Sequence, residues 1–318
     1  MREVVSRFRR LPFLEALAYV VLSVIFLYPQ SPFPGSRIAY VGDSLESVAI
    51  VGSVGRQIVE DPLRLFDAGF LHPQPNALTL TDHRLLPSLV VAPVFLITSN
   101  PVLAYNAALL LAYLLAAFGG RYLALGLGLG PLPAAFAGAL FAFHTYAINE
   151  APRLNIVSHG FVAFALGALA SWLRTGENAA RWRFALFLLL QGFCANYHLL
   201  YGVLLSVLVL AVCAVARPQL VLSRLPGLVV PGLVAIVLFL PILIPYATTM
   251  GSLELVRSRP RGIDLLHYFS TSPTNWIWGS IGPPARLQQQ GPHFVGFVAL
   301  AIALIGLVLA SRRAGAAS

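Results

Sequence analysis

Half of the acidic side chains of this chain lie in one stretch, residues 30–86, between the first apolar segment and the next. The sequence has twelve Asp and Glu and seven His, and six of those acids and two of those histidines fall there. Carboxylates and imidazoles transfer protons, and carboxylates also bind divalent cations. We therefore expect an otherwise apolar chain to present this polar loop at a membrane surface. The residues concerned are Asp43, Glu46, Glu60, Asp61, Asp67 and Asp82, with His72 and His83.

Asp43 is the first candidate for chemistry in this loop. It stands in the sequence Val-Gly-Asp-Ser, at the start of an amphipathic helical pattern over 44–60. A carboxylate held there could take a proton from an acceptor hydroxyl or bind a metal ion. The alternative is a plain helix N-cap, with Glu46 three residues later completing a capping box. The helix itself is expected to lie on the membrane surface.

A second acid and an imidazole precede the next apolar segment, in the sequence Asp82-His83-Arg84. Together with Asp43 they could surround one ion or one substrate, so a divalent metal site, if there is one, is expected on Asp43, Asp82 and His83. The alternative is a solvated turn whose Arg84 is anchored at the level of the lipid headgroups.

Arg153 and His159 begin a later apolar segment, six residues apart and on neighbouring faces of a helix. Phosphate is the ligand expected for such a pair. The alternative is an interfacial arginine together with a hydrogen-bonded core histidine.

Two further polar groups are predicted on the same side of the membrane. Asn196-Tyr197-His198 with Tyr201 forms a polar mouth or, alternatively, part of an aromatic interfacial belt. Arg257, in the sequence Arg-Ser-Arg-Pro-Arg, could grip a phosphate, or could belong to a solvated run of charge.

The positive net charge of +9 does not indicate nucleic acid. All basic residues are Arg and most stand at the ends of apolar segments, where they set membrane topology. The sequence contains no P-loop, no dinucleotide-binding glycine pattern, no Ser/His/Asp order and no Cys/His zinc spacing. Cys194 and Cys213 fall inside expected spans, so no disulfide is expected.

Composition predicts an all-α, polytopic membrane protein. Hydrophobic residues make up 58% of the chain, charged residues 10%, and the mean hydropathy is +0.79. We expect one transmembrane domain over 1–318 with about eight helices, both termini in the cytoplasm, and outer loops at 30–86 and 248–292. The expected spans are 12–29, 101–120, 131–148, 156–173, 183–197, 199–216, 225–247 and 293–310.

The apolar segment 85–97 is expected not to cross the membrane. At 1.5 Å per residue it covers about 20 Å, less than the hydrocarbon core of about 30 Å, and two prolines lie within it. If it did cross, the arginine-rich short loops that follow would face outward, against the positive-inside rule. We therefore predict a short juxtamembrane or re-entrant helix.

The order of these features resembles the GT-C class of membrane glycosyltransferases, in particular its bacterial members that use polyprenyl-phosphate sugars. The shared order is a basic N-terminus, one span, a large outer loop opening with Gly-Asp, an amphipathic helix and then many spans. The resemblance covers nearly the whole chain, as a short or truncated member of the class. The stretches that carry it are GDSLESVAIVGSVGRQIVEDPLRLFDAGFLHPQPNALTLTDHRLLPSLVVAPVFLITSNPVLAYN, APRLNIVSHG, NYHLLYG, TSPTNWIWG and GPHFVGFVALAIALIGLVL.

The resemblance implies transfer of a sugar from a polyprenyl-phosphate donor to an acceptor on the extracytoplasmic face of a bacterial plasma membrane, usually with inversion. It implies Asp43 as the base and Asp82, or next Glu46, as a second acid. Some members carry a carboxylate directly after the first, where this chain has Ser44. A divalent metal could assist, and an apolar groove between spans would hold the lipid chain. The leaving lipid phosphate needs positive groups to stabilise it, and the candidates in this chain are Arg153, His159, His198 and Arg257, with Glu46, His83, Tyr197 and Tyr201 in support.

The competing interpretation is a transporter or flippase of lipid-linked sugars, or a non-catalytic relative of the class. A transporter is expected to carry ionisable residues at mid-membrane depth and broken spans in paired positions. Here the acids fall in loops, few ionisable residues are expected at mid-membrane depth, and His144 is the best candidate among them. That distribution favours the enzyme.

Overall fold

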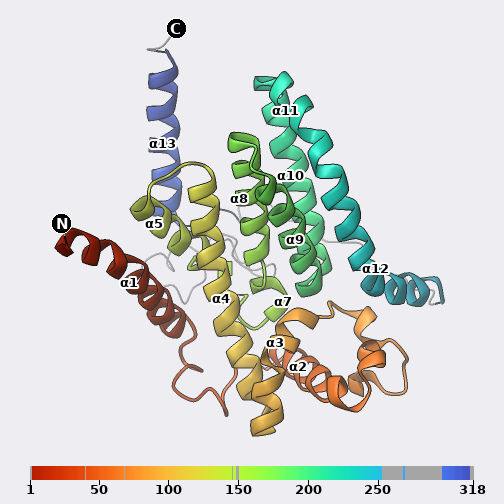
Figure 1. The fold of residues 1–318 in the computed structure, drawn as a ribbon. Coiled ribbons are helices and arrows are strands. Elements are labelled where there is room, and N and C mark those ends of the chain that lie inside the picture. Colours follow the sequence, from red (N-terminus) through yellow and green to blue (C-terminus); the bar gives the residue numbers. More distant parts are fainter. Residues whose placement is uncertain are drawn as a thin grey trace. The chain divides into compact units, whose positions relative to one another are not determined.

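The computed structural model describes residues 2–39, 41–67, 69–144, 146–147, 150–252, 268 and 296–315. Every regular element in those ranges is a helix, which confirms the predicted all-α class (Figure 1). Contacts divide the chain into two compact units, Met1–Ala142 with Glu150–Val256, and Phe143–Asn149 with Arg257–Ser318. The single transmembrane domain expected over 1–318 stays a prediction.

Four helical segments of the described chain are long and apolar enough to cross a membrane. They coincide with four of the eight expected spans, so membrane character is supported and the count of eight is not confirmed. The segments are α4 (Pro101–Gly126), α7 (Leu154–Val157) with α8 (Gly160–Thr175), α10 (Asn196–Ala216), and α11 (Pro218–Arg224) with most of α12 (Val229–Ser252).

The other expected spans correspond to shorter or less apolar helices. The span expected over 131–148 is interrupted, because α5 (Pro131–Ala142) ends at Ala142. α9 (Asn178–Cys194) has 17 residues and therefore a length of about 26 Å, and its first turns are polar. α1 (Arg2–Phe26) and α13 (Phe297–Gly315) have short apolar parts, Phe13–Phe26 and Phe297–Gly306.

Close packing of α4 against α8 fixes the segment that precedes α8. Gly119 and Gly126 of α4 meet Gly160 and Gly167 of α8 so closely that a Cβ at Gly119 would overlap the carbonyl oxygen of Gly160. Small residues allow this backbone approach in membrane helix pairs. Because Gly160 is the first residue of α8, residues 150–159 are held against the N-terminal half of α4.

An ion pair joins α1 to α4. Arg121 contacts Glu15, and the Tyr19 hydroxyl donates a hydrogen bond to the carbonyl of Ala135 at 2.7 Å. Both charged side chains are largely buried, and pairing is how charges are tolerated among apolar helices.

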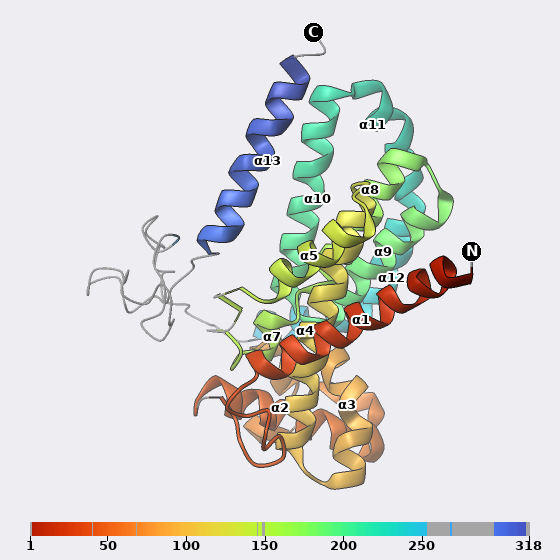
Figure 2. The same ribbon diagram turned by 90° about the vertical axis from the view of Figure 1, so that its left-hand side faces the viewer.

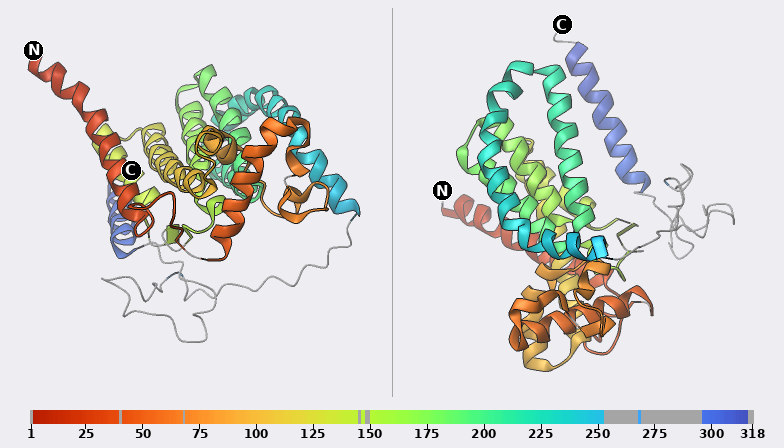
Figure 3. Two further views of the ribbon diagram at one scale, coloured as in Figure 1. Left: turned by 90° about the horizontal axis from the view of Figure 1, so that it is seen from below. Right: turned by 90° about the vertical axis from the view of Figure 1, so that its right-hand side faces the viewer.

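The predicted polar loop folds into α2 (Asp43–Glu60), three short 3-10 turns and α3 (Leu85–Thr98). α2 and α3 lie together at the end of the first unit that is farthest from α11 (Figures 2 and 3). α3 is the short helix expected over 85–97, and whether it enters the membrane stays a prediction. An apolar cluster joins this layer to α12; its members are Ile50, Val54, Phe66, Leu78, Leu85, Phe239 and Ile242.

The buried face of α2 carries Val48 and Val51 of its apolar pattern, and it also includes small polar residues. Ser44 and Ser47 are fully buried, whereas Leu45 and Val59 are exposed. The reason is that α3 and α4 cover the side of α2 that carries its small residues: a Cβ at Gly55 would overlap the Phe95 ring. That α2 lies on the membrane surface stays a prediction.

In the second unit the structure describes few residues besides α13. His144 accepts a hydrogen bond at Nδ1 from the Ala147 amide at 3.3 Å, and its ring stacks on Tyr146. Most of the predicted loop 248–292, including Arg257, lies outside the described residues.

Candidate functional site

Residues 150–159 gather most of the predicted site residues that the structure describes. This segment leads into α8, and the Tyr105 hydroxyl of α4 donates a hydrogen bond to the Pro152 carbonyl at 3.0 Å. The same hydroxyl lies 3.2 Å from Ser44 Oγ, which ties the segment to the first turn of α2. Arg153, Asn155 and His159 then extend toward three different groups of side chains.

Arg153 binds the predicted base. Its Nε donates to Asp43 Oδ2 at 2.5 Å, and its Nη1 donates to Glu150 Oε2 at 2.7 Å. Both partners of the Asp43–Arg153 pair are nearly half exposed. Partial burial would lower the pKa of Arg153, but its hydrogen bonds to Asp43 and Glu150 outweigh that effect and raise the pKa above its ordinary value. Asp43 therefore faces solvent beside a permanent positive charge.

The N-cap alternative for Asp43 is wrong. The N-cap of α2 is Gly42, whose φ of 145° is readily adopted only by glycine, and Asp43 is the first helical residue. No side chain caps the helix, so the capping box is wrong as well. Glu46 instead accepts hydrogen bonds from Thr81 and Arg84.

Asn155 holds the second predicted acid. Its Nδ2 donates to Asp82 Oδ2 at 3.0 Å, and the other oxygen of Asp82 accepts from the Asn196 amide at 3.3 Å. Burial raises the pKa of Asp82, although Asn155 and the charge of Arg84 oppose that shift. This carboxylate therefore has a greater affinity for a proton than a solvated aspartate.

The buried Arg84 side chain connects Glu46 to Asn155, the residue that binds Asp82. Its Nη2 donates to Asn155 Oδ1 at 3.1 Å and its Nη1 to Glu46 Oε1 at 3.3 Å. The residue is only 2% exposed, so the alternative of an arginine anchored at the headgroups is wrong. Arg84 and Asn155 were not among the predicted site residues; their closeness in sequence to Asp82 and Arg153 was the available signal.

His83 does not reach the predicted metal site. Its ring is fully buried between Phe66 and Tyr246, and its Nδ1 accepts from the Leu85 amide at 3.1 Å. Burial lowers the pKa of His83 to about 4, so the ring is neutral at physiological pH. Within the described residues no group of three or more His, Cys, Asp or Glu could hold a metal ion, so Asp43, Asp82 and His83 do not form the expected set.

His159 and His198 meet, as two of the predicted phosphate-binding residues should. Their ring centroids are 5.8 Å apart, and His159 Nδ1 lies 3.1 Å from the Ile156 carbonyl. Tyr197 and Tyr201 surround His198, with centroids at 4.4 and 6.3 Å. His159, at the start of α8, and the residues of the predicted polar mouth around His198 thus form one aromatic cluster.

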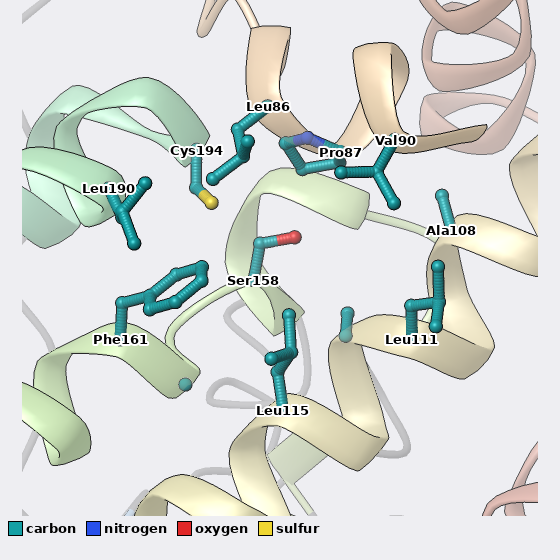
Figure 4. Close-up of a pocket in the computed structure, with 12 residues that line it drawn as sticks. Leu86, Pro87, Val90, Ala108, Leu111, Leu115, Ser158, Phe161, Leu190 and Cys194 are labelled. Carbon is teal, nitrogen blue, oxygen red and sulfur yellow. The ribbon is translucent and has the colours of Figure 1, made fainter. Parts of the chain in front are cut away.

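An apolar cavity of about 370 Å³ adjoins these groups (Figure 4). The wall of the cavity is formed by residues that directly neighbour the site segments in the chain. Leu86 and Pro87 follow residues 82–84, and Gly160 and Phe161 follow residues 153–159. Cys194 comes just before residues 196–198. Ser158 lies at the centre of the view in Figure 4, with Leu86 and Pro87 on one side and Leu115 on the other. The cavity suits a hydrocarbon group whose polar end lies at the site.

Comparison with protein-family models, curated proteins and solved structures finds no match to this chain. What bears on function is therefore the chemistry of the residues themselves. Two carboxylates, two arginines and two histidines lie around one segment, next to an apolar cavity between helices.

Proposed function

We propose that this protein is a membrane glycosyltransferase that moves a sugar from a polyprenyl-phosphate-linked donor to a hydroxyl acceptor on the extracytoplasmic face, with inversion at the anomeric carbon. One observation carries the proposal. Residues 150–159 hold two carboxylates at once, Asp43 through Arg153 and Asp82 through Asn155, beside an apolar cavity. Such a transfer needs a base, a cation for the phosphate and room for a lipid chain.

The Asp43–Arg153 pair supplies both charges that the displacement needs. A donor phosphate at Arg153 would replace Asp43 as an acceptor of the guanidinium hydrogen bonds. The freed carboxylate takes the proton of the acceptor hydroxyl while that oxygen bonds to the anomeric carbon. The bond between the anomeric carbon and the phosphate oxygen breaks, the polyprenyl phosphate leaves with the electron pair, and Arg153 stabilises its charge.

Asp82 acts in this proposal as a positioning residue. Both of its oxygens already accept hydrogen bonds, from Asn155 and from the Asn196 amide. Asn155 is two residues from Arg153, so fixing Asn155 also fixes the backbone that carries the guanidinium. Glu46 and Arg84 complete that support from α2 and from the start of α3.

The cavity would hold the part of the polyprenyl chain nearest the phosphate. His159 stands between Ser158 and Gly160, which both line the cavity, and His198 packs beside it. A phosphate held near these two rings would place its lipid chain against Leu86, Leu115 and Phe161, which are apolar. That arrangement keeps the hydrocarbon away from water.

A carrier or a non-catalytic relative is the second candidate, and one observation favours it. Arg153 binds Asp43, so the negative charge of the carboxylate is neutralised and the carboxylate is not free to accept a proton. If a donor does not displace it, the site could bind a lipid-linked sugar without transferring it.

Turnover of the donor separates these candidates. Purified protein in lipid nanodiscs would be given a polyprenyl-phosphate hexose and an excess of acceptor hydroxyl, and release of free polyprenyl phosphate would be followed. Asp43→Asn should lower the rate by about 100-fold or more, because it removes the base. Glu60→Gln is the matched control, since Glu60 is an exposed acid at the opposite end of α2.

Each outcome decides between the proposals. Equal release by wild type and Asp43→Asn, at equal folded amounts, would exclude Asp43 as the base. Donor binding without release by either protein would favour the carrier. Repeating the assay with EDTA tests whether a divalent cation takes part.

A further inference from the structure

A second apolar groove lies between α9 and α12, at the end of the first unit that carries α11. Its volume is about 310 Å³. Residues on α9 spaced three and four apart face residues on α12 with the same spacing. Ala185 on α9 and Ala235 on α12 have small side chains, which leaves the groove open between the helices. The lining residues are Trp182, Arg183, Ala185, Leu186 and Leu189 from α9, with Pro231, Val234, Ala235 and Leu238 from α12.

The surface of this groove is apolar, and a positively charged side chain stands at one end of it. Arg183 and Trp182 stand there, two of the lining residues that are exposed. From Trp182 to Leu189 the groove follows α9 for about 10 Å at 1.5 Å per residue, a distance within one leaflet of a hydrocarbon core about 30 Å thick. The groove is therefore apolar along its length and has an arginine at its edge.

Arginines outnumber acids at this end of the unit. Between residues 172 and 228 there are five arginines and one acid, Glu177. Glu177 lies 3.7 Å from Arg183, and both side chains are about half exposed, so this contact leaves Arg183 free to take a stronger anionic partner. The other four arginines are Arg174, Arg181, Arg217 and Arg224.

Two of these arginines are fixed in place by Trp172. The guanidinium of Arg224 lies 5.1 Å from the centroid of that indole and the guanidinium of Arg181 lies 5.7 Å from it. Arg181 also donates to the carbonyl of Gly227, just before α12 begins. Their charge is therefore held next to the junction of α9 and α12, and no acid among the described residues pairs with either one.

We propose that this groove binds an anionic phospholipid, with one acyl chain between α9 and α12 and the phosphate at Arg183. The apolar walls accept the chain and the exposed Trp182 suits the level of the headgroups. The excess of arginine favours a headgroup with net negative charge over a zwitterionic one, as in other basic pockets between membrane helices. This inference does not depend on the proposed function, because the candidate site adjoins the other end of α9, at Cys194.

Lipid binding in detergent tests the proposal. Dioleoyl phosphatidylglycerol and dioleoyl phosphatidylcholine would be titrated separately, and bound lipid counted by native mass spectrometry. Wild type should bind phosphatidylglycerol at least about fivefold more tightly. Arg183→Gln should weaken that preference, and Ala235→Phe should reduce binding of both lipids by filling the groove. Arg217→Gln is the matched control, an exposed arginine of the same region outside the groove lining.

Three results would overturn the proposal. The first is equal affinity of wild type for the two lipids. The second is an unchanged preference in Arg183→Gln when its thermal unfolding midpoint equals that of wild type. The third is displacement of bound phosphatidylglycerol by glycerol phosphate at equal concentration, since a headgroup site alone would not need the groove.

Discussion

The two carboxylates of the candidate site are held in opposite ways. Asp43 and Arg153 form a pair in which both side chains are more than 40% exposed. Arg84, by contrast, is buried where it bonds Glu46 and Asn155, and Asn155 in turn holds Asp82. Exposed ion pairs contribute little to stability, whereas breaking a buried one leaves an uncompensated charge. The exposed pair can therefore exchange partners at little cost, and the buried network cannot.

The Asp43–Arg153 pair and the network around Arg84 both connect α2 to residues 150–159. The first turn of α2 contributes Asp43 and Glu46, and residues 150–159 contribute Arg153 and Asn155. The buried network fixes the distance between these segments, so the exposed pair does not have to. This division suits a site in which one contact must open for a substrate while the backbone stays in place.

The largest expected difference between the two is in the free energy of unfolding that is lost when the buried network or the exposed pair is broken. Arg84→Met should lower the free energy of unfolding by about 2 kcal/mol, because it leaves Glu46, whose side chain is 35% exposed, and Asn155 without their donor. Asp43→Asn should lower it by less than about 1 kcal/mol, because it removes only the exposed partner and leaves Arg153 bound to Glu150. Denaturant titrations of both variants in the same detergent measure this difference, and equal losses would contradict the distinction between buried and exposed pairs.

The fully buried His83 should make the protein sensitive to acid. Its pKa falls from 6.5 to about 4 in the folded state, so the fold is stabilised by the neutral ring. This contribution is complete above about pH 6.5 and is lost as the pH falls from 6.5 toward 4, by on the order of 3 kcal/mol. The unfolding free energies of wild type and His83→Gln, measured from pH 7.5 to 4, should therefore converge. Parallel curves would show that His83 is not buried as a neutral ring.

Local signals in the sequence predicted much of the fold. Apolar runs of sufficient length predicted the helical segments α4, α7–α8, α10 and α11–α12, and two prolines with a short run predicted α3. The break after Ala142 was missed because the residues that follow it are also mostly apolar. Composition does not reveal where a helix ends inside an apolar stretch.

The site was predicted less completely, because its contacts join residues far apart in the chain. Asp43 and Arg153, each named separately, turned out to be partners 110 positions apart. Arg84 looked like part of a solvated turn because its acceptors Glu46 and Asn155 are 38 and 71 positions away. His83 looked like a ligand because sequence alone does not show that Phe66 and Tyr246 enclose it. Burial by distant segments decided each case.

The smallest expected effect is the coupling between Asp43 and Arg153, and it bears most directly on the proposed exchange. A double-mutant cycle with Asp43→Asn and Arg153→Met should give a coupling of about 0.5 kcal/mol at 0.1 M salt. That coupling should nearly vanish at 1 M salt, where the Debye length is about 3 Å. The exposed Asp61–Arg64 pair, with its charged atoms 3.7 Å apart, serves as the control. Its coupling should be similarly small and should also nearly vanish at 1 M salt. A coupling of several kcal/mol that salt does not reduce would mean that Arg153 holds Asp43 permanently, and a donor phosphate could then not free the carboxylate to act as a base.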